Sequence, residues 1–179
     1  MRKLMVTSLV ILLILFSCSY QTRYHNPTPE PVETLAIELE EIETINEVEW
    51  YKSEVFRISN LEREKEGVRP FLAGDEKLNR AANIRAREIV RRFEHKRLDG
   101  KNINTVFSDV GIGNWKVVAE NLASNSARVH SPQDTVNQWL NSEGHRIALL
   151  HPDYQYMAVG YAEKNGRAYI VQLFISYFD

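Results

Sequence analysis

Hydrophobic side chains recur at helical spacing in two long stretches of the chain. In residues 51–66 they lie three residues apart, at Val55, Ile58 and Leu61, before a terminating Gly67. In residues 75–94 they recur every three or four positions, at Leu78, Ala82, Ala86, Ile89 and Phe93. The second pattern predicts a long helix that is buried along one side.

A third helix is predicted from its start signal. Residues 131–134 read Ser-Pro-Gln-Asp, with a capping serine, a proline at the first helical position and an acid at the third. Apolar Val136, Trp139 and Leu140 follow, and Gly144 is a natural helix stop. We therefore expect this helix to end within residues 141–146, Asn-Ser-Glu-Gly-His-Arg.

The C-terminal part has a different pattern. Residues 157–162 and 168–174 are rich in Val, Tyr, Ile and Phe, and Asn165-Gly166 lies between them. Asn-Gly between two such runs is a strong signal for a β-hairpin. Helices followed by a hairpin predict an α+β domain or a layered α/β/α domain.

The N-terminus carries a targeting sequence. Arg2 and Lys3 precede an apolar stretch, residues 4–16, that is shorter than the roughly 20 residues of a membrane-spanning helix. Residues 15–18, Leu-Phe-Ser-Cys, resemble a relaxed lipobox of the kind found in spirochaete lipoproteins. Since Cys18 is the only cysteine, no internal disulfide is possible, and acylation accounts for an exported thiol. We predict a lipoprotein signal peptide in residues 1–17 and a lipid anchor on Cys18; an ordinary secretory peptide is the alternative.

Residues 18–49 are predicted to form a lipidated tether and an acidic arm. Pro27, Pro29 and Pro31 mark the tether, and residues 30–49 then carry eight acidic side chains and no basic one. The arm has helical apolar spacing, which fits either a solvated helix or a partner-binding arm. From residue 50 to residue 179 the pattern is that of a globular domain.

Composition supports one domain and argues against nucleic-acid binding. Hydrophobic residues make up 44% of the 179 positions, enough for one packed core. Removal of the signal peptide takes away two of the 22 basic side chains and none of the 24 acidic ones, so the mature chain is acidic. We therefore expect no nucleic-acid partner.

Two histidines and two acids are the candidate chemical groups. His95 follows the long helix, Glu120 lies in Ala-Glu-Asn-Leu, and Glu143 and His145 flank Gly144. These residues come from three distant segments, and their spacing does not by itself show that they converge.

Three stretches together resemble a known family. They are LNRAANIRAREIVRRFEHKRLDG, AENLA and VNQWLNSEGHRIALLHPDYQYMAVGYAEKNGRAYIVQLF, in this order between residues 51 and 174. They resemble the bacterial branch of the CAP superfamily, which comprises cysteine-rich secretory proteins, antigen 5 and plant pathogenesis-related proteins. The resemblance implies a CAP domain in residues 50–179 with a three-layer α-β-α sandwich, an antiparallel central sheet flanked by helices, and a cleft lined by two histidines and two acids.

The motifs show which residues of this sequence match the cleft residues of the family. His95 matches the first histidine, Glu120 the acid of the Glu-Asn motif and His145 the second histidine. The family position of the second acid is Ser142 here, so either Glu143 replaces that acid or the tetrad is incomplete. Asn121 and Ser142 are expected to support the cleft structurally. Ala119 replaces the usual glycine of the family, and the disulfides of eukaryotic members are absent.

The resemblance also implies a function, because some family members bind sterols or other lipids and others act on host proteins. We predict a lipid-anchored protein of the cell envelope, surface-exposed on the outer membrane, that binds a lipid or sterol, a host protein or an envelope partner and needs no cofactor. His95 and His145 could hold a divalent metal such as zinc, although two imidazoles alone make a weak site.

Two other interpretations of the cleft stay open. One is a metal-dependent hydrolase with Glu120 or Glu143 as base, although the chain has neither His-Glu-x-x-His nor Gly-x-Ser-x-Gly. A Ser142–His145–Glu120 triad can be written down, but nothing in the spacing of these residues requires it. The other is a buried polar network that ties the Ala-Glu-Asn loop to the helix ends without doing chemistry.

The remaining charged and aromatic clusters have structural interpretations. The basic cluster is expected to be the solvated face of the long helix, with an anionic-lipid or glycan patch as the alternative. Its members are Arg85, Arg87, Arg91, Arg92, Lys96 and Arg97. Trp50, Trp115 and Trp139 are expected to pack in the core or in a cleft wall.

Overall fold

The computed structural model describes residues 32–127 and 130–178. The predicted signal peptide, Cys18 and the proline-rich tether lie outside these residues. Within the described part, no helix combines the length and the apolar character needed to cross a membrane. The fold described below belongs to the compact unit that begins at Glu41.

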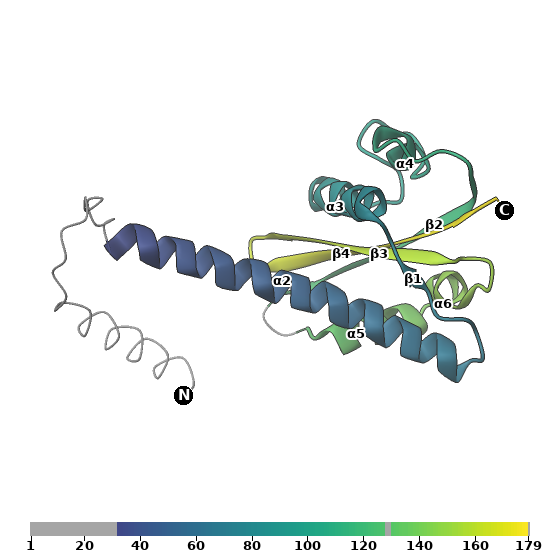
Figure 1. Ribbon diagram of the computed structural model, residues 1–179, viewed down its shortest axis with the longest axis horizontal. Coiled ribbons are helices and arrows are strands. Elements are labelled where there is room, and N and C mark those ends of the chain that lie inside the picture. Colours follow the sequence, from purple (N-terminus) through teal and green to yellow (C-terminus); the bar gives the residue numbers. More distant parts are fainter. Residues whose placement is uncertain (1–31, 128–129, 179) are drawn as a thin grey trace, which may run out of the picture. The chain divides into compact units, whose positions relative to one another are not determined.

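Five helices and four strands are described, and they form a layered sandwich (Figure 1). The helices are α2 (Val32–Lys65), α3 (Glu76–Arg91), α4 (Thr105–Asp109), α5 (Pro132–Leu140) and α6 (Glu143–Leu150). The strands are β1 (Leu72–Ala73), β2 (Trp115–Ser126), β3 (Tyr156–Lys164) and β4 (Arg167–Tyr177). They form one sheet in the order β1-β3-β4-β2, antiparallel except for the β1–β3 pair. The predicted three-layer sandwich is confirmed.

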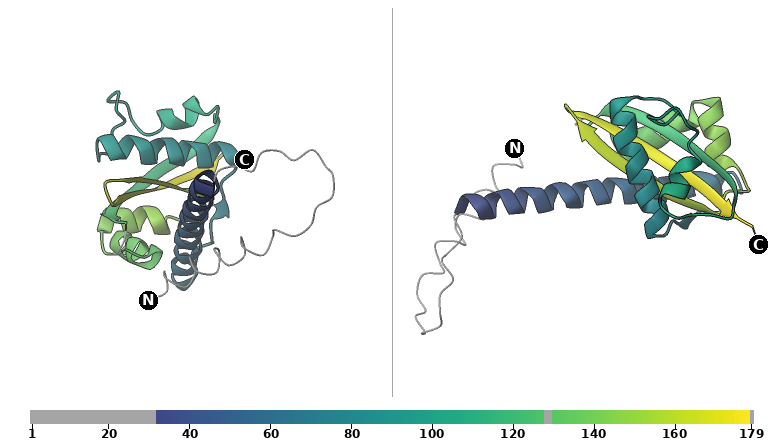
Figure 2. Two further views of the ribbon diagram at one scale, coloured as in Figure 1. Left: turned by 90° about the vertical axis from the view of Figure 1, so that its left-hand side faces the viewer. Right: turned by 90° about the horizontal axis from the view of Figure 1, so that it is seen from above.

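The sheet separates two hydrophobic cores, and Figures 1 and 2 show the layers that enclose them. One core lies under α3 and α4 and includes Leu78, Ile89 and Phe107. The other lies on the opposite face, where Val55 of α2 and Trp139 of α5 pack together. Burial of large apolar side chains on both faces is the main stabilising term of such a sandwich.

Helix α3 lies directly on strand β3. An added Cβ at Gly160 would lie only 2.1 Å from the carbonyl oxygen of Ala82. The small residues of α3, Ala81 and Ala82, are fully buried at this contact. The helix can approach the strand this closely only because position 160 has no side chain.

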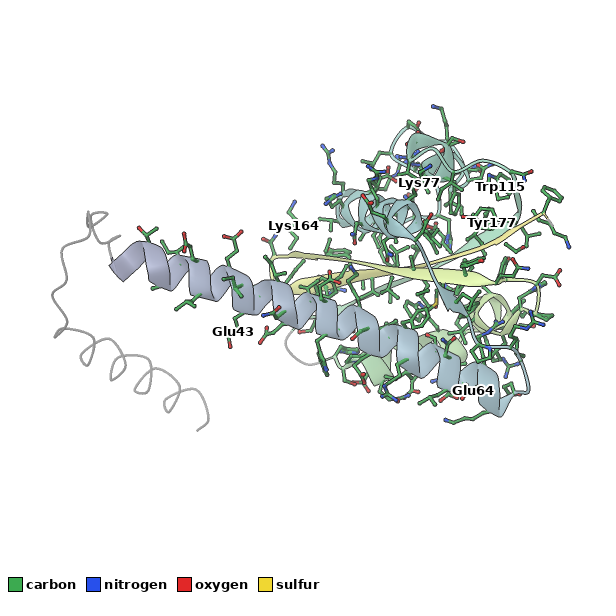
Figure 3. The ribbon with its side chains drawn as sticks, viewed as in Figure 1. Glu43, Glu64, Lys77, Trp115, Lys164 and Tyr177 are labelled. Atoms are coloured by element: carbon green, nitrogen blue, oxygen red, sulfur yellow. The ribbon has the colours of Figure 1, made fainter. Side chains whose placement is uncertain are left out.

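The predicted hairpin is confirmed. Asn165 and Gly166 have φ angles of 53° and 71°, as a two-residue turn of type I′ requires. Strand β4 then pairs with β2 from Arg167 to Tyr177, where Tyr177 faces Trp115 (Figure 3).

The start of α5 is confirmed, but its predicted stop is wrong. Ser131 and Asp134 form the capping box. Helix α5 ends at Leu140, and a second helix, α6, begins at Glu143, so Gly144 lies inside a helix. Gly144 is not among the glycines with positive φ, and the apolar residues after it continue the helical pattern. The Asn-Ser-Glu-Gly-His-Arg segment is therefore a junction between two helices.

Some predicted burial is also wrong. Phe93 follows the end of α3 and is exposed, although the sequence placed it on the buried stripe. Trp139 is fully buried as expected. Trp50, predicted to pack in the core or in a cleft wall, is 58% exposed and lines a surface hollow.

Candidate functional site

Strand β2 places Glu120 and Asn121 on opposite faces of the sheet. Glu120 is opposite Leu173 of β4, and Asn121 is opposite Gln172. Because side chains alternate along a strand, Glu120 points toward the α3 layer and Asn121 toward the α6 layer. The expected Ala-Glu-Asn loop is therefore part of a strand at the sheet's edge.

Glu120 is held by Arg85 in a buried ion pair. Arg85 Nε donates to Glu120 Oε2 and Arg85 Nη2 donates to Glu120 Oε1, each at 3.0 Å. The two side chains are 0% and 2% exposed. Two parallel hydrogen bonds between a guanidinium and a carboxylate fix the position of both groups.

The prediction that the basic cluster is a solvated helix face is thus wrong for two of its members. Arg85 also contacts Glu88 at 2.6 Å, and Glu88 in turn contacts Arg97 at 2.6 Å. Arg97 is buried and reaches Asp109 of α4 at 2.6 Å. The ion pairs run without a break from β2 through α3 to α4.

His95 approaches the same carboxylate from the solvent side. Its Nδ1 lies 3.1 Å from Glu120 Oε1, while its side chain remains 62% exposed. The hydrogen bond to Glu120 raises the pKa of His95 above its usual 6.5. His95 therefore presents a ring that is readily protonated at the protein surface.

His145 faces His95, but its pKa is shifted in the opposite direction. The ring centroids are 6.4 Å apart. Burial, and then the neighbouring charge of His95, lower the pKa of His145 below 6.5. Its Nδ1 is buried and has no hydrogen-bond partner among the described residues. The two histidines, one from each helical layer, thus lie on either side of strand β2.

A buried chain of amides holds the backbone of His145. Ser59 of α2 accepts a hydrogen bond from the Gln172 amide at 2.7 Å. Gln172 Oε1 accepts one from Asn121 Nδ2 at 3.1 Å, and the same Asn121 amide donates to the His145 carbonyl at 3.0 Å. Asn121 therefore connects β2 to α6.

The structure does not bring Glu143 or Ser142 into this group. Glu143 is the first residue of α6, is exposed, and makes no side-chain hydrogen bond or ion pair with any described residue. Ser142 precedes α6, and its side chain does not cap the helix, although its carbonyl accepts a 2.8 Å bond from the Arg146 backbone. The residues brought together are His95, Glu120, Asn121 and His145.

The described residues do not fit a zinc centre. No group of three or more His, Cys, Asp or Glu side chains in the described part is placed to hold a metal ion. Both oxygens of Glu120 are already taken by Arg85, whose positive charge opposes a second cation at this position. The hypothetical Ser142–His145–Glu120 triad does not form either, because Glu120 bonds to His95 and not to His145.

A second feature, which we call the Trp50 hollow, lies between α2, the start of α5 and the end of β3. Its volume is about 380 Å³. Its wall is mainly apolar and aromatic, with Val48, Trp50, Tyr51, Ala127, Pro132 and Tyr161. The rings of Tyr51 and Tyr161 lie 5.3 Å apart. Glu47 and Glu163 also line the hollow and give it acidic groups.

The sequence contained one signal for this hollow. Trp50-Tyr51 is an aromatic pair within the acidic helix, but Tyr161 and Pro132 are more than 80 residues away in the sequence. Only the tertiary structure brings them together. Burial raises the pKa of Tyr161, so its hydroxyl stays protonated and donates to Glu163 at 3.3 Å.

Comparisons with known proteins identify the family and the fold. The CAP family, described as the cysteine-rich secretory protein family, matches residues 56–176 and so includes His95, Glu120 and His145. The uncharacterized protein YkwD of Bacillus subtilis (strain 168) is 31% identical over 115 residues, which are 63% of this chain and 43% of that protein. The chain thus spans less than half the length of this relative.

Two solved structures share the fold. An outer surface protein from Borrelia burgdorferi has a TM-score of 0.60 and 21% identity, covering 69% of this chain and 90% of that one. An extracellular protein containing a SCP domain, from Bacillus anthracis str. Ames, has a TM-score of 0.64 and 19% identity, covering 91% of this chain and 49% of that one.

Proposed function

The chain belongs to the cysteine-rich secretory protein (CAP) family, and from this premise we propose that it is a lipid-anchored protein of the cell envelope that binds a hydrophobic ligand and catalyses no reaction. The proteins of similar fold are outer surface or extracellular proteins. The lipobox-like sequence before Cys18 supports the anchor.

The observation that carries the proposal is the engagement of Glu120. A general base or a metal-bound carboxylate needs a free oxygen that can reach a substrate or a water molecule. Glu120 is 2% exposed, and both of its oxygens accept hydrogen bonds from Arg85. The carboxylate is arranged to hold His95 and α3 in place.

The hydrolase alternative has no comparable support. A catalytic histidine is normally oriented by a carboxylate or carbonyl on its second nitrogen. His145 Nδ1 has no such partner among the described residues. His95 Nδ1 is oriented in this way by Glu120, but the other ring nitrogen of His95 makes no hydrogen bond with a described serine that could act as a nucleophile. Glu143, the other candidate base, is exposed and makes no contact with His145 or His95 that would position it.

The Trp50 hollow supports the ligand class. An exposed tryptophan beside two tyrosine rings gives a large apolar surface, and such surfaces on secreted domains mark binding sites. The two carboxylates of the hollow, Glu47 and Glu163, outnumber its single histidine, His130, and so disfavour an anionic head group. We therefore assign to the hollow a neutral, hydroxyl-bearing lipid of the sterol type in preference to a fatty acid.

The His95–His145 pair has a recognition role in this proposal. His95 is exposed and favours its cationic form, so it suits an anionic group of a partner molecule. Neither histidine lines the Trp50 hollow, so variants can separate the contribution of the pair from that of the hollow.

The test is a binding titration of the full chain with radiolabelled cholesterol and, separately, radiolabelled palmitate. Saturable cholesterol binding that Trp50→Ala weakens and Trp115→Phe leaves intact would support the assignment. The His95→Ala/His145→Ala double variant should bind cholesterol as the wild type does. Binding lost in the histidine variant, and kept in Trp50→Ala, would move the ligand to the cleft; no saturable binding of either lipid would refute the proposal.

A further inference from the structure

The outer edge of strand β3 is paired over only the first part of its length. Strand β1 pairs only with Tyr156 and Met157, and the backbone N–H of Gly74 adds a 2.9 Å bond to the Met157 carbonyl. The chain then turns into α3, whose N-cap is Asp75. The Gly74 carbonyl, which would accept the next bond of the sheet, accepts one from the Asn79 side chain at 2.8 Å.

The register identifies the backbone groups that are left without a strand partner. In a two-residue hairpin the residues flanking the turn, here Lys164 and Arg167, form a hydrogen-bonded pair. Every second residue back from Lys164 therefore bonds to β4, and the alternate ones, Val159, Tyr161 and Glu163, direct their N–H and C=O groups outward. No described residue hydrogen-bonds the backbone of Val159 or Tyr161 from this side. At about 3.3 Å per residue, roughly 13 Å of edge is open.

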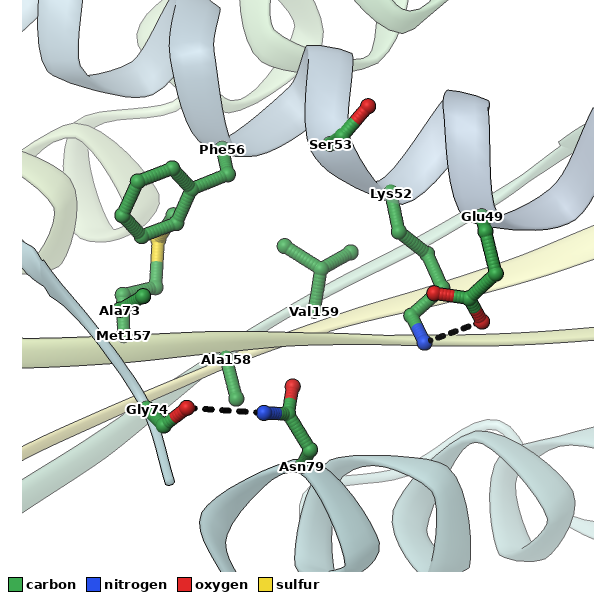
Figure 4. A pocket seen from close by; sticks show the side chains of 10 residues that line it. All are labelled: Glu49, Lys52, Ser53, Phe56, Ala73, Gly74, Asn79, Met157, Ala158 and Val159. Carbon is green, nitrogen blue, oxygen red and sulfur yellow. Dashed lines mark hydrogen bonds and ion pairs between the residues drawn. The ribbon is translucent and has the colours of Figure 1, made fainter. Parts of the chain in front are cut away.

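The part of this edge up to Val159 lies in a groove between α2 and α3, which we call the β3 groove (Figure 4). A hollow of about 260 Å³ is present where β1 ends. In Figure 4, Ser53 and Phe56 extend from α2 on one side of the strand, and Asn79 extends from α3 on the other. The side chains of Val159 and Met157 extend from β3 toward α2, and that of Ala158 extends toward α3.

We propose that the β3 groove binds an extended peptide segment of a partner protein, which continues the line of β1 and pairs with the backbone of Val159 and Tyr161. Added strands of this kind gain affinity from main-chain hydrogen bonds and specificity from pockets for alternate side chains. Open strand edges are normally covered or blocked by charge because they invite pairing. Here Lys52, whose side chain is 12% exposed, pairs with Glu49 at 2.9 Å beside Val159, so a bound peptide displaces this ion pair from the edge.

The surroundings of the groove favour this occupant. Residues of both α2 and α3 line the groove, so a single extended chain can approach β3 more easily than the edge of a second folded sheet. Phe56 and Met157 offer an apolar contact for one peptide side chain. Farther along, Glu163 and Glu47 lie near Tyr161, so a basic peptide residue is complementary there.

Amide hydrogen exchange of the full chain, followed residue by residue by NMR, tests the proposal. The probe is a pool of capped heptapeptides. Each has Lys at position five, three randomised positions, and Val and Thr in alternation at the positions that remain. We expect the pool to slow exchange at Val159 and Tyr161 by about tenfold or more, equivalent to about 1.4 kcal/mol, and to leave Gly160 and Ala162 unchanged. Unchanged exchange at Val159 and Tyr161 at the highest soluble peptide concentration would overturn the proposal.

Matched variants and a modified peptide locate the effect. Ser53 is exposed and lines the groove, so Ser53→Trp should fill the groove and abolish the slowing. Glu64 is exposed on the same helix outside the groove, so Glu64→Trp should keep the slowing. Two further peptides are N-methylated at alternate amides, one at the odd positions and one at the even positions. The peptide whose methylated amides face β3 should no longer slow exchange, and the other should still slow it. Equal slowing in both Trp variants would show that the peptide binds to another surface of the protein. Slowing that increases with protein concentration in the absence of peptide would show that a second copy of the chain covers the edge.

Discussion

Arg85 and Glu120 face each other across the boundary between α3 and β2, joined by two hydrogen bonds of 3.0 Å. Each residue alone would be a buried charge, which is costly, and together they neutralise each other. Arg85 thereby fixes the position of the carboxylate that His95 also contacts.

Removal of one partner of the pair should destabilise the domain strongly. Arg85→Met leaves the Glu120 carboxylate buried without its counter-charge and should lower the free energy of unfolding by about 3–5 kcal/mol. The double variant Arg85→Met/Glu120→Leu should recover much of that loss, since no unpaired charge remains. Urea denaturation of the wild type, the two single variants and the double variant measures the coupling. A loss below about 1 kcal/mol in Arg85→Met would show that the pair is not buried as described.

The two cleft histidines should titrate on opposite sides of their usual pKa. NMR titration should place the pKa of His95 above 6.5 and that of His145 below it. Glu120→Gln should lower the pKa of His95, because the charged acceptor is lost. His95→Ala should raise the pKa of His145 only in part, because burial is the larger cause of its shift. Equal pKa values for the two rings would contradict the geometry.

The same shifts predict opposite effects on stability. The pKa of His95 is raised on folding, so its stabilising contribution is complete below pH 6.5 and is lost as the pH rises through the folded-state value. The pKa of His145 is lowered, so stability is lost as the pH falls below 6.5 toward its folded-state value. Thermal unfolding of the wild type, His95→Gln and His145→Gln across this range separates the two effects. His95→Gln should remove the loss on the alkaline side, and His145→Gln the loss on the acidic side.

Two glycine variants test the helix junction and the contact of α3 with β3. Gly144 lies inside α6 with nothing within 4 Å of an added Cβ, so Gly144→Ala should stabilise the domain by about 0.5–1 kcal/mol. Gly160→Ala should destabilise the domain by about 1–3 kcal/mol, because the added carbon meets the Ala82 carbonyl. Melting temperatures measured together provide the comparison. Destabilisation by Gly144→Ala would restore Gly144 as a helix stop.

Membrane attachment is tested at Cys18, which lies outside the described residues. Cys18→Ala removes the only thiol that an acyl chain could modify, so the protein should move from the membrane fraction to the soluble fraction. Cell fractionation with immunodetection measures the distribution, and Ser17→Ala, which keeps the cysteine, is the control. Unchanged membrane retention of Cys18→Ala would exclude the anchor.

Local signals in the sequence predicted the parts of the fold that depend on local chemistry. The Asn165-Gly166 turn and the Ser131 capping box follow from residues that are neighbours in the chain. The burial of Arg85 could not be predicted in this way, because its partner lies 35 residues away on a strand. The sequence around a basic residue on an amphipathic helix does not indicate such a distant partner. For this reason the prediction that Arg85 lies on a solvated helix face was wrong.

The motifs indicated which residues come together at His95, but no motif indicated the Trp50 hollow or the β3 groove. His95, Glu120 and His145 each lie in a stretch that resembles the family, although the resemblance left the fourth position open between Glu143 and Ser142. The Trp50 hollow and the β3 groove depend on the path of α2 beside the sheet. No short motif in the sequence encodes that path.

The most direct test of the central claim, that the protein binds a hydrophobic ligand in the Trp50 hollow, is an NMR titration of its three tryptophan indole N–H signals with cholesterol. The Trp50 signal should shift and saturate, because this indole lines the hollow. The Trp139 signal should stay unchanged, because its N–H is buried and donates to the Leu122 carbonyl at 3.0 Å. A Trp50 signal that does not respond to cholesterol would contradict the account, and so would chelator-sensitive turnover of ester or peptide substrates by the same preparation.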